Sequence, residues 1–170
     1  VVIENPSGLV FTLAAILAAP SIVSTGLPNP RIGTSDAARG MEFRLSVVRP
    51  VLKSLQAESC ELENLIVATA AHESHLGGLD ENVFQITPIA VEELKRKGVW
   101  TNSKEAGEAP GRWSLFKQVS TTYGIYASTE EPIPSTAREA AFFWKRVYNT
   151  TAGKGTVRRF LKDADRFTSW

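Results

Sequence analysis

The chain has 170 residues, 43% hydrophobic and 22% charged, which is enough for one substantial core but too few for two large domains. Nineteen Lys and Arg residues nearly balance eighteen Asp and Glu residues, and no basic run indicates a nucleic-acid-binding stripe. The lone Cys60 excludes an internal disulfide framework, so packing must stabilise the fold.

The apolar segment Leu9 to Leu27 has the length of a membrane span, but Pro20 interrupts it and no basic residue precedes it. We therefore expect a buried N-terminal helix, which Ser7 can cap, and no stable membrane span. The chain begins at Val1 and its only methionine is Met41. We expect a processed or trimmed product, whose upstream targeting segment, if it had one, has been removed.

Capping residues, prolines and glycines divide the rest of the chain into helices. Ser35 can cap a helix through Val48, which Pro50 should kink or end. The later predicted helices start at Ser59 and Thr87, stop at Gly77 and Gly98, and resume over residues 113–127, 135–148 and 156–167. Residues 100–112 read as a surface loop, and only 82–86 could form a short strand. The pattern predicts a mainly helical single domain over residues 1–170, with N-terminal helices in 1–58.

The most informative residue is Glu73, a carboxylic acid on the apolar stripe of the helix expected to start after Ser59. The stripe recurs at offsets of three and four, through Leu62, Leu65, Ile66, Thr69 and Ala70. Burial there would raise the pKa of the carboxyl group, as a general acid working near neutral pH requires. An alternative of comparable weight is a Glu at the edge of the stripe that reaches solvent or pairs with an Arg.

His72 and His75 suggest a zinc protease, but that helical motif needs two histidines four residues apart, and these are three apart. A third ligand would have to be a carboxylate, so we expect no metal and no other cofactor. Cys60 with a distant histidine is a weak case for a nucleophilic pair, and a small buried thiol is the favoured interpretation.

Two further segments carry polar groups in apolar surroundings. Gln85 interrupts an apolar run just before Thr87-Pro88, where its amide either contacts a sugar or binds neighbouring backbone. The aromatic helix ending at Tyr148-Asn149 leads into a glycine loop and can place a phenol and an amide at a cleft wall. Phe142 and Phe143 cannot face the same side, and either Trp144 or Tyr148 could be half exposed as a carbohydrate platform.

Taken in this order, three segments resemble motifs of the lysozyme-like lytic transglycosylases, the peptidoglycan-cleaving family that includes goose-type lysozyme relatives and many phage enzymes. The counterparts are Glu73-Ser74 at a helix end, Val83-Phe84-Gln85-Ile86-Thr87-Pro88 opening a helix, and Val147-Tyr148-Asn149 with Ala152-Gly153. The resemblance covers Leu62 to about Arg159 and implies a lysozyme-like core over 59–170 with minimal β-structure and an added N-terminal helical layer. Glu73 and Gln85 are closer together than is usual in the family, and Thr150-Thr151 interrupts the last motif.

The resemblance implies cleavage of the β-1,4 bond between N-acetylmuramic acid and N-acetylglucosamine, with Glu73 as general acid and then base. It also implies that Gln85 and Tyr148 contact the sugar, that Asn149 supports that wall, and that Ser74 orients Glu73. A hydrolase would need a second carboxylate, for which Asp80 and Glu81 are the candidates nearest in sequence, although both are ordinary turn residues.

The partner implied is the glycan strand of bacterial peptidoglycan, with virion components as a further possibility and no nucleic acid. The compact, cysteine-poor composition suits a phage enzyme, such as the muralytic enzymes of enveloped double-stranded RNA bacteriophages. Such a protein would be a monomer, associated with the virion or acting in the periplasm and cell envelope. Two alternatives remain: an endopeptidase that cuts the cross-linking peptide, and an inactive wall-binding virion protein.

Overall fold

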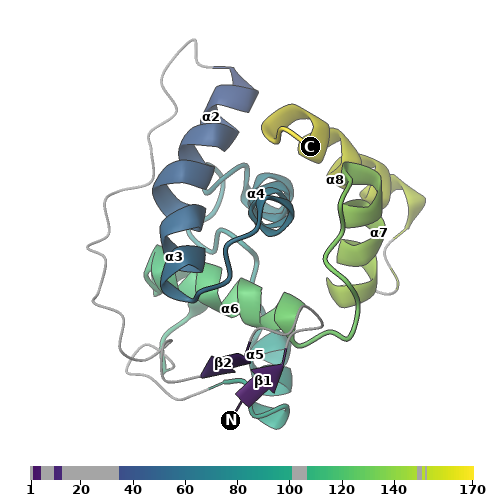
Figure 1. Ribbon diagram of the computed structural model, residues 1–170. Helices are drawn as coiled ribbons and strands as arrows, with labels where there is room; N and C mark the ends of the chain where they lie inside the picture. The colour runs from purple at the N-terminus through teal and green to yellow at the C-terminus, as the bar shows by residue number, and fades with distance from the viewer. Residues whose placement is uncertain (1, 5–9, 13–34, 101–106, 149–150, 152) are drawn as a thin grey trace.

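The computed structural model describes residues 2–4, 10–12, 35–100, 107–148, 151 and 153–170, and these form a mainly helical, compact body (Figure 1). A short antiparallel pair, β1 and β2, comes first, with Ile3 opposite Phe11. The elements are β1 (Val2–Glu4), β2 (Val10–Thr12), α2 (Asp36–Phe43), η1 (Arg44–Val48), α3 (Arg49–Ser54), α4 (Cys60–Ser74), α5 (Pro88–Arg96), η3 (Pro110–Arg112), α6 (Leu115–Ala127), α7 (Ala137–Tyr148) and α8 (Lys154–Phe167).

The predicted caps are confirmed at three helix starts. The hydroxyl groups of Ser35, Ser59 and Thr87 each accept a hydrogen bond from the backbone N–H three residues further on. Each bond satisfies a donor that the first helical turn would otherwise leave unpaired. These contacts are local, so the sequence could locate the starts of α2, α4 and α5 correctly.

Pro50 does not end the second predicted helix. The helical run continues from α2 through the π-helical turn η1 into α3 and reaches Ser54. Within it, the Arg49 N–H bonds to the Arg44 carbonyl, the wider spacing of a π-helix, and Pro50 falls in the first turn of α3. Because proline tolerates a first-turn position, this shift in hydrogen bonding accommodates it without a break.

Helix α4 is the centre of the fold. Every residue from Leu62 to Ala71 is buried, and α2, α6, α7 and α8 all pack against the helix (Figure 1). The prediction of a single buried stripe is therefore wrong, since a helix wrapped on all sides needs no polar face. Its one buried carboxylate near the start, Glu63, is held by the guanidinium groups of Arg44 and Arg49.

Two predictions about strands and the N-terminus need correction. The helix expected within Leu9 to Leu27 is wrong for Val10–Thr12, which pair with β1 instead, and the rest of that segment and Ser7 lie outside the described residues. Residues 82–86 form turns rather than a strand, because Asn82 bonds across them to Ile86. None of the described helices is long and apolar enough to cross a membrane.

Candidate active site

Glu73 lies in the last turn of the central helix, where the fold leaves it only partly open to water. Burial raises the pKa of its carboxyl group to about 7, and an interaction with the Trp144 indole opposes the rise. Within the described chain no Lys or Arg pairs with it. Of the interpretations left open by the sequence, the partly desolvated acid fits the structure and pairing with an Arg does not, although Glu73 keeps some exposure to solvent.

The chain turns sharply directly after Glu73-Ser74. His75 and Leu76 both adopt left-handed backbone conformations, with φ of 52° and 61°, and Gly77 follows at 83°. Two consecutive non-glycine residues in this region are uncommon, and such backbone gathers at functional sites. The helix ends two residues earlier than the Gly77-Gly78 pair predicts, so Glu73 stands at the edge of the turn.

Trp144 forms the apolar wall beside Glu73. Its ring stacks on Phe160 at 5.1 Å and on Tyr148 at 6.4 Å, and it meets the His72 ring edge-on at 4.9 Å. Trp144 is only 4% exposed, so it is not the half-exposed carbohydrate platform that the sequence allowed. Its Nε1 has no partner of standard hydrogen-bond geometry among the described residues, so its interaction with Glu73 is weak.

Three hydroxyl groups, those of Thr69, Tyr126 and Tyr148, follow one another from the central helix toward α7. The Thr69 hydroxyl donates to the Leu65 carbonyl at 2.8 Å, so the Tyr126 hydroxyl, at 2.5 Å, must be the donor to Thr69. Burial raises the pKa of Tyr148, the hydroxyl groups of Tyr126 and Thr122 lower it, and the negative charge of Glu73 raises it. Tyr148 therefore stays protonated, and its buried hydroxyl lacks a well-formed hydrogen bond within the described chain.

Ser74 has a different position from the one predicted. It is fully buried, and its hydroxyl donates to the Val83 carbonyl at 2.8 Å and accepts from the Gly77 N–H at 2.7 Å. No bond joins it to Glu73. Ser74 therefore ties the end of α4 to the following loop, and it supports the acid only through the backbone.

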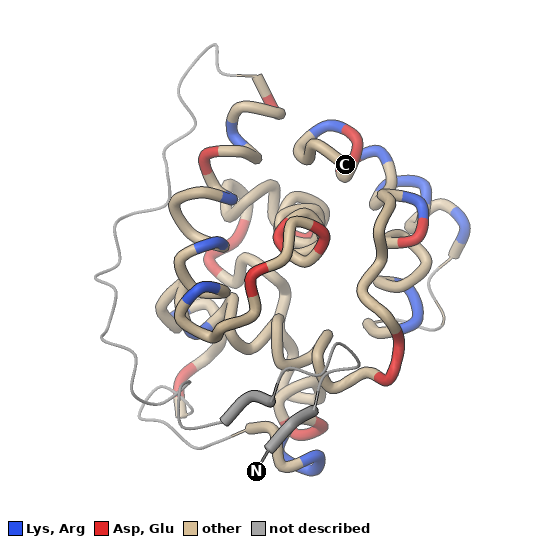
Figure 2. Tube along the Cα trace, viewed as in Figure 1, with Lys and Arg blue, Asp and Glu red and all other residues tan. Residues whose placement is uncertain are grey.

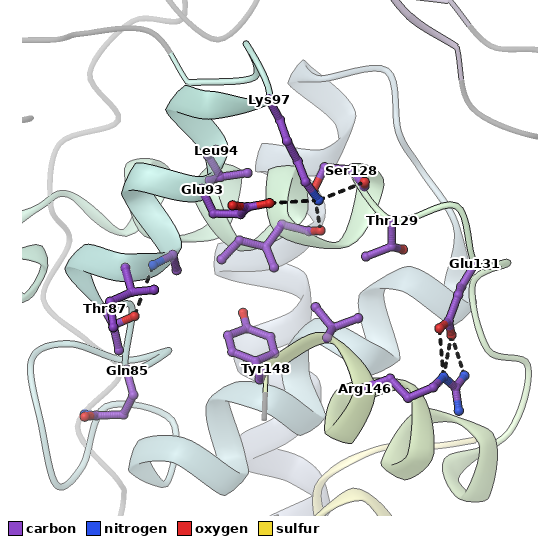
Figure 3. Close-up of a pocket in the computed structure, with 14 residues that line it drawn as sticks. Gln85, Thr87, Glu93, Leu94, Lys97, Ser128, Thr129, Glu131, Arg146 and Tyr148 are labelled. Atoms are coloured by element: carbon purple, nitrogen blue, oxygen red, sulfur yellow. Dashed lines mark hydrogen bonds and ion pairs between the residues drawn. The ribbon is translucent and has the colours of Figure 1, made fainter. Parts of the chain in front are cut away.

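Gln85 is also engaged with its own loop. It has a left-handed backbone, with φ of 48°, and its amide nitrogen donates to the Asn82 carbonyl at 3.0 Å. The backbone-bound interpretation of this amide is thus the one observed, and Figure 3 shows the amide turned away from Tyr148. Asn149 lies outside the described residues.

A groove of about 510 Å³ opens beside Tyr148 and Gln85 (Figure 3). Its two cations are both paired, Lys97 with Glu93 at 3.7 Å and Arg146 with Glu131. The lining residues are Gln85, Thr87, Ile89, Ala90, Glu93, Leu94, Lys97, Ile125, Ser128, Thr129, Glu131, Arg146, Val147 and Tyr148. Glu73 is not in this wall. Tyr148 is, and its ring stacks on that of Trp144, whose indole interacts with Glu73.

The other candidate groups are engaged or exposed. His72 bonds to Asp163 at 3.2 Å, and burial lowers its pKa. The residues that the structure describes contain no group of three His, Cys, Asp or Glu side chains that could hold a metal. Cys60 is exposed at the start of α4, so the expectation of a buried thiol is wrong. Asp80 and Glu81 are exposed in the turn after α4, as turn residues would be.

Comparisons with protein-family models, with curated protein sequences and with solved structures found no match to this chain. The residues around Glu73 must therefore indicate the function by themselves. The sequence assigned no role to Tyr126 and considered Trp144 only as a carbohydrate platform. The only sequence feature that could have indicated these two residues is the number of aromatic residues in α6 and α7. An ordinary hydrophobic core has the same feature, so it does not identify a site.

Proposed function

We propose that the protein is a peptidoglycan-degrading enzyme of the lytic transglycosylase or lysozyme type, which cleaves the β-1,4 bond between N-acetylmuramic acid and N-acetylglucosamine. One observation carries the proposal: Glu73 is a half-buried acid with a pKa of about 7, and it interacts with Trp144, whose ring stacks on a tyrosine that lines an open groove. A carboxyl group with that pKa is protonated in a useful fraction of molecules near neutral pH and can give up its proton there.

In the proposed reaction, Glu73 donates its proton to the bridging oxygen as the bond from C1 of the muramic acid to that oxygen breaks. The glucosamine leaves with a free 4-hydroxyl group. The Glu73 carboxylate then removes the proton of the muramic 6-hydroxyl, whose oxygen bonds to C1 and closes an anhydro ring. The carboxyl group is restored, so a single acid serves both steps.

The surroundings of Glu73 favour this one-carboxylate route over hydrolysis. Hydrolysis by inversion uses a second carboxylate roughly 6.5 to 9.5 Å from the acid, with a water between them. No carboxylate in the described chain contributes to the pKa of Glu73, whereas desolvation and Trp144 do. Asp80 and Glu81 are both solvent-exposed, and Asp80 accepts the Asn82 N–H at 2.8 Å.

The same proposal gives the protein a lysozyme-like core and a phage role in penetrating or lysing the bacterial wall, from the virion or the periplasm. Of the sugar contacts that the resemblance implies, Tyr148 is the best supported, because it lines the groove while the Gln85 amide is bonded to its own loop.

Glu73→Gln provides the test. We expect the variant to fold and to lose the ability to clear a suspension of purified sacculi, because an amide cannot donate a proton to the leaving oxygen. Glu61→Gln is the matched control, since Glu61 is exposed at the other end of the same helix. Undiminished clearance by the Glu73 variant would refute the glycosidase and leave an endopeptidase, for which a chelator should then abolish activity. If the wild type clears nothing, the inactive wall-binding protein remains.

A further inference from the structure

The last two helices carry a local excess of positive charge. Together α7 and α8 contain eight Lys and Arg residues against three Asp and Glu residues, in a chain whose net charge is only +1. The remainder of the chain is therefore net acidic. Figure 2 shows the basic residues along both helices, which pack against one another on the same side of the molecule (Figure 1).

Most of these cations have no anionic partner within the described chain. Arg146 pairs with Glu131 and Arg166 pairs with Asp36. The other six form no ion pair or hydrogen bond with any described residue, and all but one are solvent-exposed: Arg138, Lys145, Lys154, Arg158, Arg159 and Lys162. We call this set the basic face. Like charges held close together without counter-charges repel one another, so an external anion would stabilise the arrangement.

An exposed aromatic ring lies within this face. Phe142 is 46% exposed, whereas its neighbour Phe143 is 1% exposed and belongs to the core. Arg138 and Lys145 are one turn before and one turn after Phe142 on α7, so they flank it on the same side of the helix. The combination of outward basic residues and an exposed aromatic is typical of helices that lie on membrane surfaces.

We propose that the basic face docks the protein on an anionic phospholipid surface, with Phe142 inserted among the headgroups. The cations spread over two adjacent helices, which suits a broad charged plane. The groove beside Tyr148 has a different character, since both of its cations are paired within the protein. Neither Phe142 nor any residue of the basic face lines that groove, so docking and the proposed reaction use different residues.

The expected loss of membrane affinity follows from the number of charges removed. Each Lys or Arg near an anionic bilayer strengthens binding by about fivefold. Replacing Arg158, Arg159 and Lys162 together by Gln should therefore weaken binding on the order of a hundredfold. These side chains are exposed on the outer side of α8, while Phe160 and Ala164 hold the helix to the core, so the triple variant should fold normally.

The experiment is co-sedimentation with vesicles of phosphatidylcholine alone and of phosphatidylcholine mixed with phosphatidylglycerol. We expect the wild type to bind only the mixed vesicles and to be released by added salt. The triple variant should lose this binding, and Phe142→Ser should weaken it without any change of charge. A control with the same loss of charge is Lys53→Gln/Lys95→Gln/Arg96→Gln, which lies on α3 and α5 and should bind as the wild type does.

Three results would overturn the proposal: equal vesicle binding by the triple variant and the wild type, loss of binding in the control, or tighter binding to RNA than to the mixed vesicles. Clearance of lipid-free sacculi distinguishes this proposal from the proposed function. The triple variant should retain that activity, and Glu73→Gln should lose it while binding vesicles normally. Loss of clearance in the triple variant would indicate that the basic face binds peptidoglycan, and it would contradict membrane docking.

Discussion

Replacing Glu73 by Gln should stabilise the protein, and it should do so much more at alkaline than at acidic pH. The folded state raises the pKa of this carboxyl group from 4.5 to about 7 because it removes water from the charged form. The folded protein therefore binds the Glu73 proton more tightly than the unfolded chain does. The resulting stability is fully present below pH 4.5 and is lost as the pH rises through about 7. The amide of the variant has no proton to lose.

The size of the effect follows from the shift. A single pKa unit corresponds to about 1.4 kcal/mol, so the full change is worth about 3 kcal/mol. Because Glu73 is partly open to solvent, we expect about 2 kcal/mol between roughly pH 5 and pH 8. For a domain of this length, that is an additional rise of about 4 to 8 °C in Tm of the variant at the higher pH.

The assay is urea or thermal unfolding of wild type, Glu73→Gln and the exposed-site control Glu61→Gln at both pH values. Only the difference between variants matters, since the other titrating groups are common to all three proteins. If the difference in free energy of unfolding between Glu73→Gln and the wild type is the same at both pH values, ionisation of Glu73 does not destabilise the folded state. The argument for an acid poised near neutral pH would then fail.

Three further outcomes follow from the site and its supports. Tyr148→Ala should slow clearance of sacculi about tenfold, because the groove loses the aromatic ring that would hold the sugar; an unchanged rate would remove the residue from the site. Ser74→Ala should lower the free energy of unfolding by about 1–3 kcal/mol in urea titrations, because the buried loop groups lose their partner. Gly40→Ala should destabilise by at least about 2 kcal/mol, because the added Cβ would lie 1.8 Å from the Phe167 carbonyl oxygen. Normal stability in either case would contradict the packing described.

The sequence predicted helix starts better than helix surroundings. The hydroxyl caps at Ser35, Ser59 and Thr87 act within one turn, so local sequence is sufficient to place them. Whether a helix is covered on one side or on all sides depends on neighbours distant in the chain. The enclosure of α4 and the strand at Val10–Thr12 were therefore missed, as were the π-helical turn around Pro50 and the exposure of Cys60.

The candidate site shows the same division. Glu73 could be recognised from the sequence because a carboxylate within an apolar helical pattern is unusual, whichever elements pack against the helix. The split between Phe142 and Phe143 followed from helical geometry and is observed. The positions of Trp144 and Ser74 depend on how α8 and the loop after α4 pack, which no local pattern encodes. The sequence therefore identified the acid but not its wall or its support.

Mass spectrometry of the soluble fragments released from purified sacculi tests the central claim most directly. If Glu73 acts alone as acid and base, the wild type should release muropeptides with anhydro-muramic ends and Glu73→Gln should release none. New reducing ends would show hydrolysis by a second group. Cleaved cross-links with intact glycan strands, or the same fragments from Glu73→Gln, would contradict the assignment of this residue as the catalytic acid.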